Sequence, residues 1–504
     1  MTPGVRGARP TSIIEILDTA STAWPERVLL VDPALGRTVT YAQFADLVEG
    51  AADQLLGRGL SAGDRVAVLA RNGLESAVAI WSCARAGLVF VGLPVDAPSA
   101  RHHQLLDLVG PAILLAQPEL AGTLDGLEMA DAAGVLLSSP QPWDQSRELP
   151  AEDTTYMLIP TSGTTGRPKA VRVTGRMAGH AAEFYAAALG LGPQDRTAIH
   201  LPFGWVSGHL TQLAPAMHSG GSAVTMADYS APLLVATARA HEVTWLDVVP
   251  SIWEGLLRCD GFATLTGVRL AVYGGAPAPA GTLDRVRAVL PQIELHDVYA
   301  LSETCAPVTH LPDGVDRPGT VGRAVRYAEL RVVDASDRAM AAGEVGEVWV
   351  RSPVVTPGYW GDAERLRLTA DGWLRTGDLG WLDADGYLTM AGRAVDLVVR
   401  GGVNIYPQEV ERALMRSGQL ADAGAFAVPS TVAGQNVAAA VVALPGVTVD
   451  VPALRRCVQE ALGAHAVPRP LLVLDALPRN ANGKLDRIAL AAAESTGVRV
   501  RSQG

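Results

Sequence analysis

Apolar runs of two lengths alternate along the first 300 residues of this chain, and this alternation constrains the fold more than any other feature. Short strand-like runs at 65–70 and 88–93 are each followed by a longer amphipathic run, at 73–86 and 99–108. Strands that alternate with helices predict α/β layers built on mostly parallel sheets. The same order returns further along the chain, in strand-like runs at 243–249 and 269–273 and helical runs at 251–258 and 280–289.

Beyond residue 320 the pattern changes to short strands separated by Gly and Asp turns. The runs 328–333 and 343–351 predict antiparallel strands in a β-rich portion. We therefore expect an α/β fold in which layered α/β sheets form a large N-terminal domain, followed by a small C-terminal α+β domain. The elements expected in the small domain are helices at 407–415 and 451–462 and strands at 423–428 and 438–443.

Length and composition limit the class of protein. A chain of 504 residues exceeds what one hydrophobic core organises, and 48% hydrophobic with 18% charged residues is typical of a globular protein. The net charge of −11 argues against nucleic acid as a partner, because a phosphate backbone requires a basic surface. Arg85 interrupts the longest apolar stretch, 77–95, and the N-terminus lacks the apolar core of a signal peptide, so we expect no membrane partner.

The number and spacing of the cysteines indicate the redox compartment of the protein. The four cysteines are widely spaced, with no CxxC pair and no histidine at ligand spacing nearby. Neither a disulfide framework nor a structural zinc site is therefore expected, and a reduced cytoplasm fits.

The loop 161–171, TSGTTGRPKAV, lies between the apolar runs 156–160 and 171–173, so it is expected to join two strands. Its glycines allow backbone N–H groups to converge on an anion, its hydroxyls add short donors, and Lys169 adds a mobile positive charge. The spacing differs from the Walker loop, whose lysine directly follows a glycine. A solvated hairpin loop is the alternative. The residues predicted to cradle phosphate are Thr161, Ser162, Gly163, Thr164, Thr165, Gly166 and Lys169.

Eight further motifs follow in order, and together with the loop they resemble the superfamily of adenylate-forming enzymes. This superfamily includes acyl- and aryl-CoA synthetases, amino-acid adenylation domains and firefly luciferase. The resemblance implies attack of a carboxylate on the α-phosphorus of ATP, with release of pyrophosphate, followed by transfer of the acyl group to a thiol. The motifs are GWVSGH (204–209), GGAP (274–277), YALSET (299–304), GYW (358–360), TGDLG (376–380), GRAVD (392–396), GGVNIYPQEVE (401–411) and NANGK (480–484).

The resemblance assigns roles around ATP to individual residues. Glu303 is expected to bind Mg²⁺, for which one protein carboxylate beside phosphate oxygens suffices. Ser302 occupies the position of a threonine that contacts the α-phosphate. Tyr299 is expected to stack on adenine, and Asp378 to accept from the ribose hydroxyls. The remaining nucleotide contacts are assigned to the wall Gly274, Gly275 and Ala276, to Asp297 at the exocyclic amine, and to Arg393 beside the ribose.

The C-terminal motifs imply a mobile domain. Lys484 is expected to bridge the carboxylate and the α-phosphate during adenylation, although Asn482-Gly483 before it also suits a plain exposed turn. Asp396 resembles the hinge between an adenylation domain over residues 1–395 and a C-terminal domain over 396–504. Gly401 and Gly402 are expected to line a thiol tunnel in the second half-reaction, and an ordinary loop is the alternative.

The expected acyl pocket is mostly small or apolar, with no Arg or Lys among its candidates. It suits a neutral aliphatic, alicyclic or aryl acid and disfavours a dicarboxylate. Four residues differ from those that are usual in the motifs of this family: Ala170 and Ala300 replace glycines, Ser302 replaces threonine and Val395 replaces lysine. Of these four, only Ala300 would press on a substrate. The pocket candidates are Trp205, as a gate or a core residue, with Ser207, Val249, Trp253 and Ala300.

The leading hypothesis is a stand-alone acyl-CoA ligase that uses ATP, Mg²⁺ and CoA. An adenylate-only ligase that passes its acyl group to a carrier protein or partner enzyme in trans is a second reading. An amino-acid activator is less favoured, because 203–210 contains no acidic residue to bind an α-amine. A non-catalytic nucleotide-binding relative is the alternative of another class, and the retained charged groups argue against it.

Overall fold

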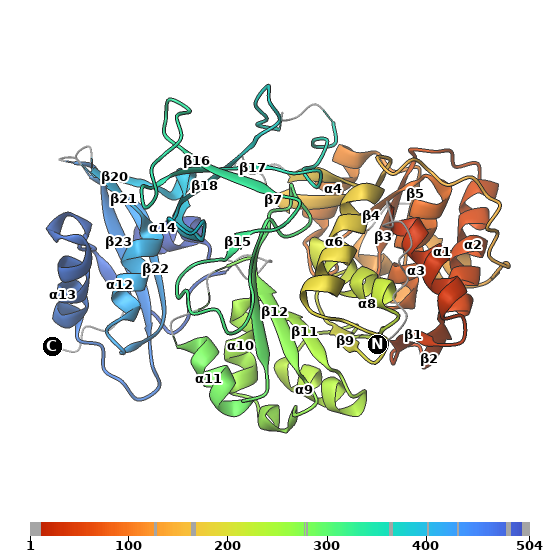
Figure 1. The fold of residues 1–504 in the computed structure, drawn as a ribbon, viewed down its shortest axis with the longest axis horizontal. Helices are drawn as coiled ribbons and strands as arrows, with labels where there is room; N and C mark the ends of the chain where they lie inside the picture. Colours follow the sequence, from red (N-terminus) through yellow and green to blue (C-terminus); the bar gives the residue numbers. More distant parts are fainter. Residues whose placement is uncertain are drawn as a thin grey trace.

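Four sheets organise the computed structural model, which describes residues 12–124, 129–162, 168–276, 278, 281–361, 366–400, 403–430, 433–479 and 485–495. The predicted α/β class is confirmed, with mostly parallel strands in the N-terminal half. Figure 1 shows α2 and α3 at one end of the molecule and α12 and α13 at the other, with the β-rich sheet between. In the part of the chain that the structure describes, no helix is long and apolar enough to span a bilayer.

The first sheet has six strands in the order β6-β5-β3-β4-β7-β8. Its central pairs are parallel, and β7 and β8 form the antiparallel pair that flanks the predicted phosphate loop. The strands are β3 (Arg65–Leu69), β4 (Val89–Gly92), β5 (Ile113–Ala116), β6 (Ala130–Asp131), β7 (Thr155–Ser162) and β8 (Pro168–Thr174), and the associated helices are α1 (Ile13–Ala23), α2 (Tyr41–Gly57), α3 (Leu74–Ala86), α4 (Ser99–Val109) and α5 (Ala132–Leu136).

The second sheet has nine strands in the order β15-β14-β13-β12-β11-β9-β10-β1-β2. Parallel pairing runs from β13 to β1, and antiparallel strands close both edges. The strands are β1 (Val28–Asp32), β2 (Arg37–Thr40), β9 (Arg196–Ile199), β10 (Ser222–Thr225), β11 (Trp245–Val248), β12 (Leu270–Gly274), β13 (Glu294–Tyr299), β14 (Thr309–Leu311) and β15 (Arg323–Ala324). The helices are α6 (Gly175–Ala188), α7 (Val206–Gly208), η2 (His209–Leu213), α8 (Ala214–Ser219), α9 (Ala231–Ala240), α10 (Pro250–Leu257) and α11 (Thr282–Val289).

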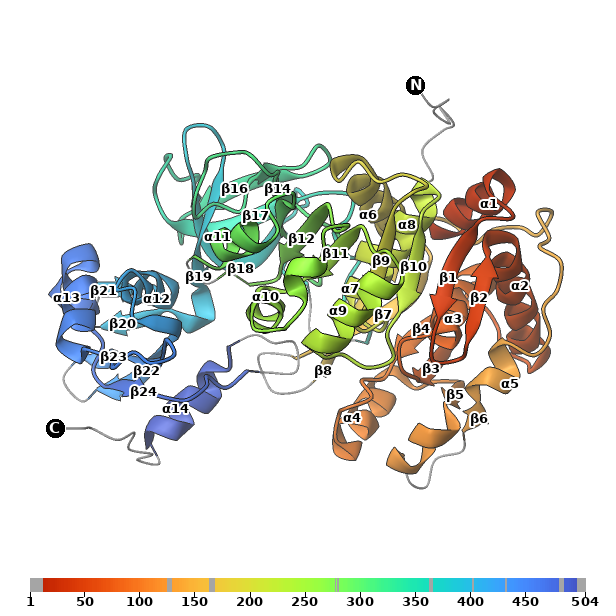
Figure 2. The ribbon, with the colours of Figure 1, turned by 90° about the horizontal axis from the view of Figure 1, so that it is seen from below.

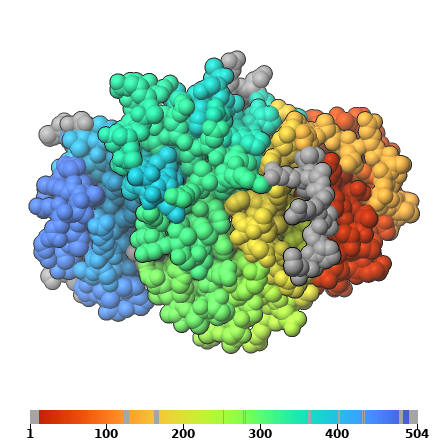
Figure 3. Space-filling model, viewed as in Figure 1, coloured from red at the N-terminus to blue at the C-terminus, as the bar shows by residue number. Residues whose placement is uncertain are grey.

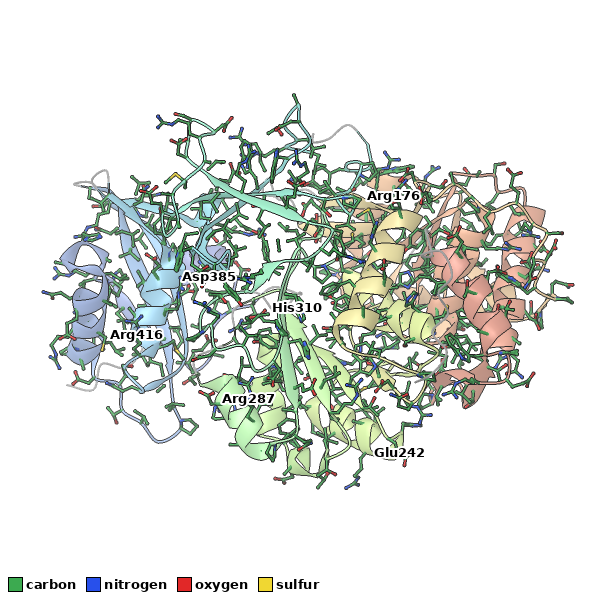
Figure 4. All side chains as sticks on the ribbon, in the orientation of Figure 1. Arg176, Glu242, Arg287, His310, Asp385 and Arg416 are labelled. Carbon is green, nitrogen blue, oxygen red and sulfur yellow. The ribbon has the colours of Figure 1, made fainter. Side chains whose placement is uncertain are left out.

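Side chains fill the space between the sheets, and His310 on β14 lies near the centre of the molecule (Figure 4). Its ring stacks on His296 of β13, with 5.3 Å between centroids and 8° between planes. This stacked pair joins the antiparallel edge of the nine-stranded sheet to its parallel part. Phe184 of α6 also meets the His310 ring edge-on, with 5.5 Å between centroids, and ties the same edge of the sheet to the helical layer.

The β-rich portion and the C-terminal part each form a separate sheet. In the first, β16 (Glu329–Val333), β17 (Gly346–Arg351), β18 (Leu374–Leu382) and β19 (Leu388–Arg393) are all antiparallel, as predicted. Figure 2 shows the C-terminal elements gathered beyond β19. They are β20 (Val398–Arg400), β21 (Val403–Ile405), α12 (Pro407–Met415), β22 (Leu420–Ser430), β23 (Gly434–Ala443), α13 (Val451–Leu462), β24 (Leu471–Val473) and α14 (Arg487–Ser495).

The C-terminal sheet has its own hydrophobic core, formed by residues such as Val410, Leu414 and Val441. It contacts the β-rich sheet through α12, where Arg412 donates to the carbonyl of Met390 at 3.0 Å. Figure 3 shows the C-terminal elements lying against the rest of the surface. A division of the chain at 395/396 remains a prediction.

A buried ion pair links α2 to α3 inside the main core. Arg85 Nε lies 2.8 Å from Glu49 Oε2, and their side chains are only 1% and 2% exposed. Arg147 contacts the second oxygen of Glu49 at 2.9 Å, and Trp143 covers the Arg85 guanidinium at 4.2 Å. Removing one partner would therefore leave a buried, uncompensated charge.

We expect Glu49→Ala to lower the free energy of unfolding by about 3–5 kcal/mol, because Arg85 would keep its charge without its carboxylate. Urea denaturation followed by circular dichroism measures this. Glu460→Ala, on the exposed face of α13, is the matched control and should change stability by less than about 0.5 kcal/mol. Equal effects of the two changes would contradict the assigned role of the buried pair.

Candidate functional site

The parallel strands β12 and β13 end side by side, and the predicted nucleotide wall lies at this end. Gly274, the last residue of β12, pairs with Val298, and a Cβ at Gly274 would lie 2.5 Å from the carbonyl oxygen of Val298. Gly275 follows with φ +80°, a conformation that favours glycine. The local backbone therefore requires both glycines next to Asp297 and Tyr299 of the neighbouring strand.

Asp378 joins this strand end to the β-rich sheet. The Tyr299 hydroxyl donates to Asp378 Oδ2 at 2.6 Å, and Arg393 Nε lies 3.0 Å from Oδ1. Asp378 and Arg393 face each other in the β18–β19 register, and Asp378 is only 5% exposed. Asp378 raises the pKa of Arg393, and burial raises the pKa of Tyr299. Three residues predicted to surround the nucleoside are thus in direct contact.

Glu303 and Lys169 are linked by a residue to which the sequence reasoning gave no role. The Tyr359 hydroxyl donates to Glu303 Oε1 at 2.7 Å, and Lys169 Nζ lies 5.1 Å from the centre of the Tyr359 ring. Tyr359 belongs to the GYW motif, but its partners lie 56 and 190 positions away in sequence, so no local pattern indicated them. The two groups predicted to handle phosphate and Mg²⁺ are therefore close to one aromatic ring.

The segment that carries Tyr359 is fixed to both neighbouring elements. Thr356 N–H donates to the Glu303 carbonyl at 2.7 Å, and its buried hydroxyl donates to the Arg172 carbonyl at 2.7 Å. Tyr359 itself forms a bridge with Val171 of β8. Residues 356–360 thus clip the six-stranded sheet to the loop after β13.

Asp297 lies in β13 with its carboxyl surrounded by protein. This desolvation raises the pKa of Asp297 to about 7, although a hydrogen bond with Tyr273 acts in the opposite direction. Tyr273 is opposite Asp297 in the β12–β13 register. A neutral carboxyl has both a donor and an acceptor, which suits the edge of an adenine ring.

The acyl-pocket candidates come from three elements. Trp205 caps α7 with Ser207 inside it, Val249 caps α10, and Ala300 follows β13. Trp253 on α10 is fully buried, and its ring lies 6.3 Å from that of Phe262. A shared acyl pocket remains a prediction for these residues.

Several predicted positions fall outside the described residues. The structure describes the backbone of Thr161 and Ser162 at the end of β7, together with Lys169, Ser302 and Asp396. The predictions that lie outside the described ranges concern Gly163, Thr164, Thr165, Gly166, Gly401, Gly402 and Lys484.

Two sequence families match this chain. The family described as AMP-binding enzyme matches residues 17–360, and the AMP-binding enzyme C-terminal domain matches residues 409–484. The chain belongs to the AMP-binding enzyme family. Its resemblance to adenylate-forming enzymes is thereby confirmed.

This AMP-binding enzyme is similar over nearly its whole length to characterised ligases. It is 31% identical to the sulfoacetate–CoA ligase of Cupriavidus necator, over 95% of this chain and 97% of the relative. It is 30% identical to the indoleacetate–CoA ligase of Aromatoleum aromaticum, over 89% and 92%.

Solved structures show the same similarity. The o-succinylbenzoate CoA synthetase of Bacillus subtilis with its acyl-adenylate intermediate is 29% identical, with a TM-score of 0.82 over 94% of this chain and 97% of that chain. The same enzyme with ATP and magnesium ion also has a TM-score of 0.82.

We expect Tyr359→Phe to raise the Mg²⁺ concentration needed for half-maximal pyrophosphate release by about 10-fold, because it removes a hydrogen bond to an ionised group. Titration of Mg²⁺ at fixed ATP measures this. The matched control is Tyr387→Phe, whose ring packs against Arg317 and Arg323 and should leave the requirement unchanged. An unchanged Mg²⁺ requirement in Tyr359→Phe would refute the positioning role.

Asp297 should make stability depend on pH. Its pKa is about 7 in the folded protein and about 4 in an unfolded chain, so the folded state holds the extra proton between these values. Stability should therefore fall as pH rises from about 4 to about 7, and Asp297→Asn should remove that fall. Unfolding free energies measured across this range test it, with the exposed Asp228→Asn as control. Parallel curves for wild type and Asp297→Asn would contradict the shifted pKa.

Proposed function

We propose that this protein activates a small carboxylic acid with ATP at the junction of β13, β18 and the 356–360 segment, and then transfers the acyl group to CoA. It is an ATP-dependent, AMP-forming acid–thiol ligase. One observation carries the proposed site. Tyr299 and Glu303, four residues apart, begin two contact chains, one to Asp378 and Arg393 and the other through Tyr359 to Lys169.

In the first half-reaction the acid's carboxylate attacks the α-phosphorus of ATP, a P–O bond forms, and the bond to pyrophosphate breaks. Two anions approach each other, so positioning and charge stabilisation dominate the catalysis. Asp378 and Arg393 would orient the ribose, and Lys169 would hold the departing phosphates. A Mg²⁺ ion held by Glu303 would neutralise phosphate charge. The carboxylate fits this task because the Tyr359 hydroxyl holds Oε1 in place, and Oε2 belongs to the same planar carboxylate.

The lysine content of the chain supports the two lysine assignments. Of 41 Lys and Arg residues only two are lysines, and these are Lys169 and Lys484. Everywhere else arginine supplies the positive charge. Lysine is a compact point charge on a flexible stem, whereas arginine is a planar fork, so the two are not interchangeable at a crowded phosphate. Both lysines fall in motifs that the family resemblance places on ATP.

The proposed thiol acceptor and the proposed class of acid rest on different observations. The three ligases reported above act on sulfoacetate, indoleacetate and o-succinylbenzoate, and they share CoA as the acceptor. CoA is therefore the proposed thiol. These acids differ in charge and size, so the proposed acid class depends on the pocket of this chain, whose candidates include no arginine or lysine.

We expect Lys484→Ala to slow adenylation by roughly 100-fold or more, because it removes one charge stabiliser of the transition state. Carboxylate-dependent ATP–pyrophosphate exchange measures this half-reaction alone. Lys484→Arg retains the charge but not the shape, and we expect it to restore only part of the rate. Full exchange activity in Lys484→Ala would refute this role.

A library of carboxylic acids, assayed for pyrophosphate release with and without CoA, tests the proposed function. At least one acid should release pyrophosphate, and CoA should convert it to an acyl-CoA with multiple turnovers. If an acyl-adenylate accumulates and CoA has no effect, the acceptor is a carrier protein or partner enzyme instead. ATP binding without pyrophosphate release from any acid would indicate a non-catalytic relative.

A further inference from the structure

The turn that carries Trp205 lies where the two large sheets meet. It follows β9 of the nine-stranded sheet, and the Trp205 N–H donates to the Pro202 carbonyl at 3.1 Å, which closes residues 202–205 into a tight turn. Three neighbouring strands of the six-stranded sheet, β3, β4 and β7, each lead to a group that contacts this turn or its continuation to His209. The contacting residues are Asn72, Gly92 and Tyr156.

Asn72, in the loop between β3 and α3, pairs with the backbone on both sides of Pro202. Its Nδ2 donates to the Leu201 carbonyl at 2.9 Å, and its Oδ1 accepts from the Phe203 N–H at 3.0 Å. One carboxamide thus binds a carbonyl and an N–H of the same segment, as a neighbouring strand would. Pro202 itself has no N–H to offer to a sheet. Asn72 therefore supplies the pairing that fixes the start of the turn.

Close backbone contacts restrict the rest of the turn. A Cβ at Gly92, the last residue of β4, would lie 2.6 Å from the Cα of Gly204, closer than real Cβ atoms approach. A Cβ at Gly208 would lie 2.6 Å from the Leu201 carbonyl oxygen, the same oxygen that accepts from Asn72. Closely packed backbone has little room to shift.

The far end of the segment is fixed at His209, which is fully buried. Its Nε2 lies 3.0 Å from the hydroxyl of Tyr156 on β7. Its ring also meets that of Trp81 on α3 edge-on, with 5.7 Å between centroids. The segment 201–209 is therefore held at its start by Asn72 and at its end by His209.

The middle of this fixed segment is its accessible part. Residues 204–207 are half-buried, whereas 208–213 are buried. Trp205 joins none of the hydrophobic core clusters formed by the described residues, whereas Trp253 of α10 is fully buried in one of them. A large aromatic side chain that is accessible on a rigid backbone is suited to contact with a ligand. This favours a gate over a core residue as the role of Trp205.

We propose that Asn72 is a positioning residue for Trp205, and that the turn it fixes makes Trp205 a stop that limits the length of the acid. This inference rests on the proposed ligase function and narrows its substrate class. Asn72 acts through the backbone of Leu201 and Phe203 and needs no contact with the substrate. A side chain on a fixed turn discriminates by size, because it does not move aside for a longer acyl chain.

Pairs of acids that differ in length test this role. The readout is the ratio of kcat/KM for pyrophosphate release between the best acid of the library and its homologue with two more methylene groups. Asn72→Ala removes both hydrogen bonds to the turn, so the ratio should fall at least about 5-fold, since the fit of one methylene is worth roughly 10-fold or more. Trp205→Ala removes the stop itself and should lower the ratio at least as far. The ratio does not depend on how much of the enzyme is folded.

The double variant separates an effect through Trp205 from a general loosening of the fold. If Asn72 acts through Trp205, Asn72→Ala should leave the ratio unchanged in enzyme that already carries Trp205→Ala, because residues that act as one unit are not additive. Gln292→Ala is the matched control. The Gln292 carboxamide also donates to backbone carbonyls, in 265–268, and its loss should leave the ratio at the wild-type value.

Two further measurements address the turn without relying on Asn72→Ala activity alone. Amide hydrogen exchange of the ligand-free protein should be about 5-fold faster in the peptide 201–205 of Asn72→Ala, because the Phe203 N–H loses its acceptor. Gly92→Ala disturbs the same turn from β4 while Asn72 stays in place, and it should lower the ratio as well.

The outcomes distinguish the two levels of inference. If no acid of any kind releases pyrophosphate, the ligase function and the positioning role both fail. If acids are activated and the ratio is the same in wild type, Asn72→Ala and Trp205→Ala, the ligase function stands and the positioning role is overturned. An equal fall in Gln292→Ala, or a lower ratio in the double variant than in Trp205→Ala alone, would also overturn it.

Discussion

The carboxylate of Asp378 is the interaction on which the candidate site depends. It accepts from Tyr299 at the end of the nine-stranded sheet and pairs with Arg393 on the last strand of the β-rich sheet. Three residues after Arg393 comes Asp396, at the end of the short helix Ala394–Asp396 that leads to the C-terminal sheet. One buried charge therefore connects the predicted nucleoside wall, the β-rich sheet and the start of the C-terminal part. A charged hydrogen bond inside protein is also stronger than one in water.

Tyr359 makes a similar connection at the part of the site that is predicted to bind phosphate. Because residues 356–360 are bonded both to β8 and to the loop after β13, the six-stranded and nine-stranded sheets are held in a fixed relation. Lys169 lies on β8 and Glu303 lies in the loop after β13, so residues 356–360 set their separation. The site thus forms where three sheets meet, and none of the sheets contains it alone.

The sequence predicted local elements better than contacts between them. The helices 407–415 and 451–462 were predicted with their observed bounds, because each begins with proline in its first turn and has a strong helical period. The order of nine strands was not predictable, since pairing such as β1 with β10 depends on residues almost 200 positions apart. The role of Tyr359 was missed for the same reason. The sequence identifies Tyr359 as part of the GYW motif, but only the fold shows which residues it contacts.

Asp247 shows how a strand pattern can conceal chemistry. Within 243–249 the sequence predicts a buried strand, and that prediction is confirmed for the core of the run. A charged residue inside such a run is nevertheless a signal, because a buried carboxylate must be paired, protonated or functional. No acidic residue lies in 203–210, where the resemblance places the partner of an α-amine, and Asp247 lies outside that range, in β11. Folding brings Thr211 and Asp247 together across 36 positions of sequence. The hydrogen bond of Asp247 is therefore a property of the fold, which the apolar pattern of its strand did not reveal.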